Sequence, residues 1–158
     1  MTARGEHRYT ASLAWTGAAA GPTATYQSYS RAWRMKFAGK PPLDGSADPA
    51  FRGDPALHNP EELLLAALAS CHMLSYLALC SLKKIEVTSY SDKPEGTMKR
   101  LANGQTGFVS VKLYPQVTIA DASKLGTAIA LHHDAHAECY IANSVNFPVE
   151  NAPTITVG

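Results

Sequence analysis

Residues 59–84 read NPEELLLAALASCHMLSYLALCSLKK, and this stretch decides the fold. Asn59 can cap a helix, Pro60 suits its first turn, and the two glutamates that follow place negative charge where the helix dipole favours it. The apolar residues after them occupy most faces of a helix, and basic residues close the run near Lys83. The pattern predicts a buried central helix from Asn59 to about Lys83.

The sequence before this helix is typical of strands. Residues 7–16 and 24–38 carry apolar and aromatic side chains in loose alternation, which predicts two strands or hairpin arms. Residues 39–58 contain four prolines and three glycines, too many strand and helix breakers for regular structure. We expect a long loop there.

The sequence after the helix predicts a hairpin, a second helix and a last short strand. Residues 85–98 and 104–119 alternate in part and are separated by a polar turn at 99–104. Residues 122–139 return to helical spacing, and the tail contains the strand-like segment TITV. This order favours an α+β fold, with the helices packed on a largely antiparallel sheet.

Composition bounds the possible functions. A chain of 158 residues, 46% hydrophobic and 17% charged, suits a single domain spanning residues 1–158. The formal net charge of +1 leaves no electrostatic footprint for nucleic acid or an anionic membrane. No stretch reaches the roughly 18 apolar residues of a spanning helix, and the N-terminus lacks the apolar run of a secretory signal. We expect a cytoplasmic protein that binds neither nucleic acid nor membrane.

The sequence contains three cysteines, an odd and sparse set unlike the dense even sets of secreted disulfide scaffolds. Cys71 lies among small residues of the central helix, so a working thiolate there needs a cation nearby in space. Arg31 and Arg34 of the N-terminal strands are the candidates. Cys80 has no polar neighbour but Ser81, and we expect it to be a core residue.

Cys139 falls where the second helix ends, a position that favours a surface or cleft and hence thiol exchange. It also belongs to a candidate metal site, because His132, His136 and Cys139 project within about 60° on one helical face. Structural zinc usually needs four ligands, and no second ligand pair is present. We therefore expect no metal, and only one of His132, His133 and His136 to be buried.

The segments NPEELLLAALASCHM and AHAECYIANS together resemble the OsmC/Ohr family of thiol-dependent organic hydroperoxide reductases. That family starts a helix with NPE ten residues before its peroxidatic cysteine, as Glu61 stands to Cys71, and places a second cysteine near the end of a later helix, as at Cys139. His72 stands where those reductases usually have an aromatic residue, and Tyr140 where they have proline. The sequence leaves the subfamily, OsmC or Ohr, open.

The resemblance implies a peroxidase that reduces small or fatty-acid hydroperoxides to alcohols. Cys71 would be the peroxidatic thiol and Cys139 the resolving thiol, joined during turnover in a disulfide that an external thiol or dithiol reduces. Arg31 would organise the site together with Glu61. No metal or organic cofactor is implied.

Two of these assignments have alternatives. Arg34 can take the place of Arg31, because strand alternation would put the two arginines on opposite faces. Glu62 can take the place of Glu61, since one of the two completes a capping box with Asn59.

Helical geometry bears on the assembly. Ten residues along one helix separate Glu61 from Cys71 by about 15 Å and turn them about 80° apart. Either a long arginine side chain bridges part of that distance, or Glu61 serves a cysteine of another subunit. The resemblance implies an intertwined homodimer with sites at the interface, which fits the second option.

Three functions remain open from the residues. The first is the peroxidase, with a pocket lined by Leu64, Leu68, Tyr76 or Phe147. The second is a non-catalytic small-molecule-binding protein of the same fold. The third is a zinc-stabilised structural protein that uses the histidine and cysteine ligands named above.

Overall fold

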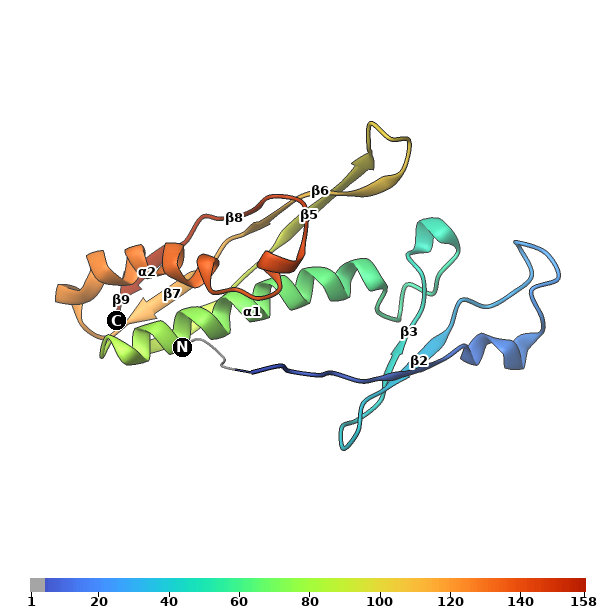
Figure 1. Cartoon of the computed structure of the whole chain (residues 1–158), viewed down its shortest axis with the longest axis horizontal. Helices are drawn as coiled ribbons and strands as arrows, with labels where there is room; N and C mark the ends of the chain where they lie inside the picture. The colour runs from blue at the N-terminus through green and yellow to red at the C-terminus, as the bar shows by residue number, and fades with distance from the viewer. Residues whose placement is uncertain (1–4) are drawn as a thin grey trace. The chain divides into compact units, whose positions relative to one another are not determined.

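The structure is a computed structural model that describes residues 5–158 of the chain. Residues 1–4, which begin the stretch expected to lack a secretory signal, lie outside the described residues. The backbone forms two compact units, the first ending at Leu63 and the second beginning at Leu64. Figure 1 shows the first unit from blue to green and the second from green to red. The assignment of residues 1–158 to one domain stays a prediction.

The first unit is built on a three-stranded antiparallel sheet in the order β1-β2-β3. Its strands are β1 (Ser12–Ala14), β2 (Trp33–Lys36) and β3 (Leu43–Gly45), and short 3₁₀ helices form at Thr16–Ala20 and Pro49–Phe51. The observed strands are shorter than the stretches 7–16 and 24–38 from which they were predicted.

The prediction of a loop without regular structure at residues 39–58 is wrong at β3. Gly45 pairs with Trp33 across the sheet, and the Trp33 ring occupies the space that a Cβ at this position would need. The Trp33 indole Nε1 also donates to the Ser46 carbonyl oxygen over 3.0 Å. A glycine that weakens an isolated strand is therefore required here, because it lets the indole ring lie against the backbone.

Helix α1 (Pro60–Leu82) confirms the central prediction. Only one stripe of it is fully buried, at four-residue spacing: Leu68, His72, Tyr76 and Cys80. Leu74 and Leu82 are each 62% exposed, so the helix is less buried than its sequence predicts. The expectation that no stretch is long and apolar enough to cross a membrane is not met by α1, which suffices by length and composition alone, as the core helices of many soluble proteins do.

The second unit contains two three-stranded sheets, β4-β7-β9 and β5-β6-β8. The strands are β4 (Val87–Ser91), β5 (Glu95–Arg100), β6 (Thr106–Leu113), β7 (Gln116–Ile119), β8 (Val149–Asn151) and β9 (Thr154–Val157). The predicted hairpin is divided between the two sheets, with β5 antiparallel to β6 and β4 antiparallel to β7. Strands β8 and β9 then add in parallel to β6 and β7. The fold is thus α+β, as predicted, with three small sheets in place of one.

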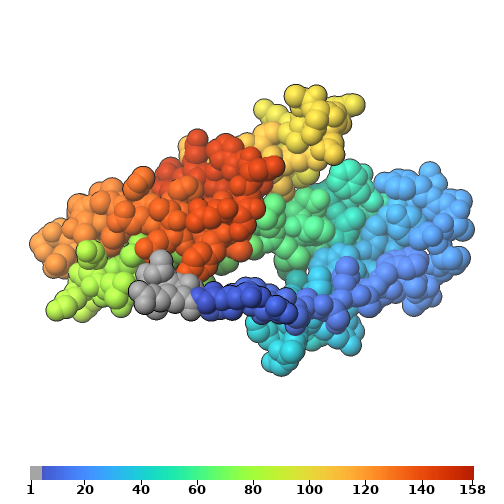
Figure 2. Space-filling model, in the orientation of Figure 1, coloured from blue at the N-terminus to red at the C-terminus, as the bar shows by residue number. Residues whose placement is uncertain are grey.

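Helix α2 (Leu125–Ala137) follows a short 3₁₀ turn and confirms the second predicted helix. Figure 1 shows α2 beside the C-terminal half of α1. Tyr76 and Cys80 of α1 join Ala128, Leu131 and Ala135 of α2 in one core cluster, which the strands β7 and β9 complete. In Figure 2 the tip of the β5–β6 hairpin (yellow) stands out from this unit, in keeping with the exposure of every residue of β5.

Candidate active site

Cys71 and Cys139 lie near each other in the second unit. Cys71 lies on α1, and Cys139 lies two residues beyond the end of α2. Both are free thiols, and they lie close enough together for Cys71 to raise the pKa of the Cys139 thiol. Two thiols in contact need only a small movement to form a disulfide, provided that their backbones allow its geometry.

The two thiols differ in exposure. The expectation that Cys139 lies at a surface or cleft is wrong. Cys139 is 1% exposed, whereas Cys71 is half-buried. The chain folds over Cys139 directly after α2, because the Asn143 amide donates to the Cys139 carbonyl oxygen and a 3₁₀ turn forms at Ala142–Ser144. Cys71 is therefore the thiol that a dissolved substrate reaches first.

Burial keeps Cys139 protonated. The pKa of the Cys139 thiol is raised to about 11, chiefly by burial and in part by the neighbouring Cys71. Backbone N–H groups of Ala142 and Ile141 act in the opposite direction, since they can donate to a thiolate. Cys139 is thus a neutral thiol at pH 7, and two backbone N–H groups are placed to stabilise its thiolate when it forms.

Cys80 is a core residue, as predicted. It is 1% exposed, and burial raises the pKa of its thiol. Its side chain is hydrogen-bonded to Tyr76, whose hydroxyl donates to the Ala128 carbonyl oxygen over 3.2 Å. This thiol belongs to the packing between α1 and α2.

A buried histidine pair lies next to the thiols, and the sequence analysis did not identify it. His72 Nε2 lies 3.0 Å from His132 Nδ1, and both rings are 1% exposed. The Tyr76 ring stacks on His132 at a centroid distance of 3.8 Å. The spacing of His72 on the stripe with Leu68 and Tyr76 is the sequence signal that places it on the buried face.

The pair is neutral near pH 7. The pKa of each ring is lowered to about 4, chiefly by burial and in smaller part by the charge of His136 at His72 and of His72 at His132. One ring therefore donates and the other accepts in their shared hydrogen bond. The outer nitrogens, His72 Nδ1 and His132 Nε2, are buried and have no hydrogen-bond partner among the described residues.

The histidines of α2 do not form the zinc site weighed from the sequence. His132 bonds to His72, His133 is exposed and His136 is half-buried, so one of the three is buried as expected. Among residues 5–158, no group of three or more histidine, cysteine, aspartate or glutamate side chains is arranged to hold a metal ion.

Arg31 and Glu61 line a pocket of about 230 Å³ in the first unit. Its other lining residues are Trp33, Ser46, Ala47, Asp48, Phe51 and Pro60. The Arg31 guanidinium carbon lies 3.8 Å from the Tyr29 ring centroid and 4.8 Å from that of Tyr26, and its Nη atoms donate to the carbonyl oxygens of the same two residues. The arginine is thus held in place with donors to spare.

Arg34 has a different role. Its guanidinium donates to both oxygens of Asp44 across β2 and β3, at 2.6 and 2.7 Å. This hydrogen bond raises the pKa of Arg34 and lowers that of the Asp44 carboxyl group. Arg34 is an exposed cross-strand partner and does not line the pocket that contains Arg31.

The two glutamates at the start of α1 are also distinguished. The Glu62 amide donates to Asn59 Oδ1 over 2.9 Å, and Glu62 Oε2 accepts from the Asn59 amide over 3.3 Å, which is a capping box. Within residues 5–158 the Glu61 carboxylate has no hydrogen bond or ion pair. Glu61 is therefore the glutamate available to the pocket.

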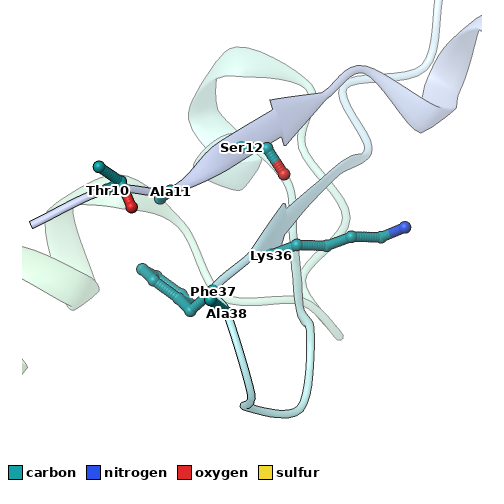
Figure 3. Close-up of a pocket in the computed structure, with 6 residues that line it drawn as sticks. All are labelled: Thr10, Ala11, Ser12, Lys36, Phe37 and Ala38. Atoms are coloured by element: carbon teal, nitrogen blue, oxygen red, sulfur yellow. The ribbon is translucent and has the colours of Figure 1, made fainter.

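Two further pockets lie in the first unit. One of about 320 Å³ is apolar and shares Trp33 and Pro60 with the Arg31 pocket; its other lining residues are Leu13, Trp15, Met35 and Leu63. The other, of about 390 Å³, runs between β1 and β2 (Figure 3). Figure 3 shows Lys36 and Phe37 extending in opposite directions there. Lys36 is the one charged side chain among the described residues that line this groove, and it points away from Phe37.

The residues proposed from the sequence to line a pocket are instead packed core residues. Leu64, Leu68 and Phe147 belong to one hydrophobic cluster of the second unit, and Tyr76 belongs to the other. Their positions stabilise the unit around the thiols.

Comparison with known proteins identifies the family. Residues 53–152 match the family model described as OsmC-like protein. The chain belongs to the OsmC-like family. A comparison with curated proteins found no match. A solved OsmC-like protein of unknown function from Vibrio cholerae is 34% identical to this OsmC-like protein, with a TM-score of 0.86 over 94% of this chain and all of that one.

More distant structures share the fold of this OsmC-like protein. An OsmC-like protein from Mycoplasma pneumoniae is 14% identical, with a TM-score of 0.72 over 96% of this chain and 99% of its own. An organic hydroperoxide resistance protein OsmC from Legionella pneumophila is 17% identical, with a TM-score of 0.66 over 97% of this chain and 99% of its own. At such identities the likeness concerns the fold alone.

Proposed function

We propose that this OsmC-like protein is a thiol-dependent peroxidase that reduces organic hydroperoxides to alcohols. The observation that carries the proposal is the proximity of a half-buried Cys71 to a fully buried Cys139, two free thiols brought together from α1 and from the turn after α2. Solved members of the same fold include proteins described as organic hydroperoxide resistance proteins. That description supports a peroxide-related role here.

The chemistry takes place in two thiol steps. The Cys71 thiolate attacks the terminal peroxide oxygen, the O–O bond breaks, and the alkoxide takes a proton and leaves as the alcohol while Cys71 becomes a sulfenic acid. The Cys139 sulfur then attacks the Cys71 sulfur, and a disulfide forms as water leaves. An external thiol or dithiol reduces this disulfide and is itself oxidised.

The electrostatics of Cys139 suit this order. While Cys71 carries negative charge it raises the pKa of Cys139, so the resolving thiol stays protonated. Oxidation converts Cys71 to a neutral sulfenic acid and removes that repulsion. The amides of Ala142 and Ile141 then favour the Cys139 thiolate at the moment when it must attack.

We assign the Arg31 pocket to the same reaction. A guanidinium stabilises a thiolate and donates to a peroxide oxygen, and a carboxylate orients the guanidinium. Because Glu61 and Cys71 lie about 15 Å apart on one helix, the pocket of one copy would serve Cys71 of a second copy. The proposed enzyme is therefore a homodimer.

Thiol counting with peptide mapping tests the peroxidase. One equivalent of an organic hydroperoxide should remove two thiols from the wild-type protein as a Cys71–Cys139 disulfide, and none from Cys71→Ser. Cys80→Ser is the matched control and should still form the disulfide. Persistence of all three thiols in excess peroxide would refute the proposal.

Light scattering at micromolar concentration tests the dimer. The expected mass is about twice the 16.9 kDa of one chain. Leu74 is an exposed apolar side chain of α1, three residues from Cys71, so Leu74→Lys should weaken a dimer in which the second copy approaches Cys71. A wild-type monomer would contradict the assignment of Glu61 to a second copy.

A second candidate function rests on the apolar pocket of about 320 Å³ beside Trp33. A pocket of this size and character suits an apolar small molecule bound without chemistry. Retention of an apolar fluorescent probe by the Cys71→Ser, Cys139→Ser double variant, with no peroxide-dependent thiol loss in the wild type, would favour this function over the first.

A further inference from the structure

The contacts between α1 and α2 follow one register. Cys71 contacts Cys139, His72 bonds to His132, and the Tyr76 hydroxyl bonds to the Ala128 carbonyl. Residue numbers rise along α1 while they fall towards the start of α2. The two helices therefore run antiparallel where they touch, and the thiol pair lies at the end of this row of contacts.

The histidine pair is a hydrogen bond between two side chains that are both 1% exposed. Leu131 and Ala135 of α2 belong to the apolar core cluster that also contains Tyr76, and apolar contacts of this kind tolerate small shifts. A hydrogen bond of 3.0 Å between two buried rings does not, because sliding would leave two further ring nitrogens unpaired. Buried polar pairs are known to select one register among several apolar alternatives.

We propose that His72 and His132 are positioning residues, which hold α1 and α2 in the register that brings Cys71 and Cys139 together. Their part in turnover rests on the proposed peroxidase; their effect on the thiol pair does not. His72 adjoins Cys71 in the chain, and His132 lies on α2, whose last residue, Ala137, precedes Cys139 by two positions.

Helix geometry explains why register matters for this disulfide. A slip of one residue would move Cys71 by about 1.5 Å along α1 and turn it by about 100°. Disulfide formation needs the two Cα atoms within about 7 Å and the side chains facing each other. Loss of the histidine pair should therefore lower the effective concentration of the Cys139 thiol near Cys71.

The direct test is the equilibrium between the protein and a dithiothreitol redox buffer. In this exchange oxidised dithiothreitol is reduced as Cys71 and Cys139 lose two electrons and two protons to form their disulfide. The fraction oxidised is measured by thiol alkylation and mass spectrometry, in variants that also carry Cys80→Ser so that only two thiols count. No peroxide is involved, so the result is independent of the peroxidase proposal.

Four substitutions separate the hydrogen bond from bulk and polarity. His72→Leu removes the bond and should lower the equilibrium constant about tenfold. His72→Gln reaches the position of Nε2 with an amide and should restore it, whereas His72→Asn is polar but too short and should resemble His72→Leu. His133→Leu alters an exposed histidine of α2, next to His132, and should leave the constant within about a factor of two.

The comparison of Gln with Asn at position 72 decides the proposal even where His72→Leu fails to fold. Equal constants for the two amides, or a wild-type constant in folded His72→Leu, would overturn it. In peroxide turnover the same variants should accumulate Cys71 sulfenic acid, detected with dimedone, because only the second thiol step is slowed. If the wild type forms the disulfide in the redox buffer but does not react with peroxide, the peroxidase proposal is refuted and the positioning role of the histidine pair is still supported.

Discussion

The two units hold their functional side chains by opposite means. In the second unit Cys139, His72 and His132 are buried, and burial is the main cause of their shifted pKa values, always towards the neutral form. In the first unit Arg34 and Asp44 are exposed, and the hydrogen bond between them shifts both pKa values towards the charged form. Burial thus favours the neutral forms of the thiol and the histidines in the second unit. In the first unit the hydrogen bond between two exposed side chains favours their charged forms.

The largest effect should come from Cys139→Ser in the second unit. Peroxide should still oxidise Cys71, but the sulfenic acid has no resolving thiol, so nearly all turnover with a dithiol reductant should be lost. Steady-state peroxide consumption measures the loss, and dimedone adducts at Cys71 locate it. Cys80→Ser, also buried, should retain turnover; equal losses in the two variants would mean that burial alone, not the contact with Cys71, explains the effect.

The next effect is a pH dependence of stability. The folded-state pKa of about 4 for His72 and His132 lies below the unfolded value near 6.5. The unfolded chain therefore binds more protons between these values, so stability is full above pH 6.5 and falls as the pH drops towards 4. The loss should be at most about 3 kcal/mol per ring, since each pKa unit corresponds to about 1.4 kcal/mol.

Urea unfolding at several pH values checks this dependence. The side chains that face the pair are Tyr76, whose pKa burial raises, and the half-buried His136. In the His72→Leu, His132→Leu double variant the stability curve should be flatter between pH 6.5 and 4 than in the wild type. A parallel curve would show that other groups govern the acid loss.

A smaller effect is expected in the first unit, where two arginines of similar sequence context can be compared. Arg31→Gln should slow Cys71 oxidation by about tenfold, because hydrogen bonds to charged groups contribute about 1.5 kcal/mol or more and 1.4 kcal/mol is a tenfold change. Arg34→Gln should leave the rate nearly unchanged, since Arg34 pairs with Asp44 outside the pocket. Stopped-flow oxidation rates decide between them, and the reverse ranking would reassign the arginine.

Local signals made part of this arrangement predictable from the sequence. The start of α1 follows from capping chemistry within four residues, and the helical spacing of α2 is equally local. Strand β3 was missed because it depends on Trp33, which approaches the backbone of Gly45 from another part of the chain. The burial of Cys139 was missed for a similar reason, since the covering turn at Ala142–Ser144 forms after the helix has ended.

The choice between functional alternatives depended on tertiary structure. Arg31 and Arg34 have similar neighbours in sequence, but only the former lines a pocket with Glu61. The resemblance supplied the thiol pair, because it rests on spacing along two helices. It offered no indication of the His72–His132 bond, which joins residues 60 positions apart.

The smallest effect separates structure from function within a single turn of α1. Asn59→Ala removes the side-chain acceptor of the capping box and should lower the free energy of unfolding by about 1 kcal/mol, with little change in the rate of Cys71 oxidation. Glu61→Gln should slow Cys71 oxidation and lower the free energy of unfolding by less than Asn59→Ala does, because Glu61 lines the Arg31 pocket and takes no part in the capping box. Urea unfolding and stopped-flow oxidation of both variants give the comparison. If Glu61→Gln lowers stability and spares the rate, the glutamate serves the helix, and the Arg31 pocket loses its proposed link to Cys71.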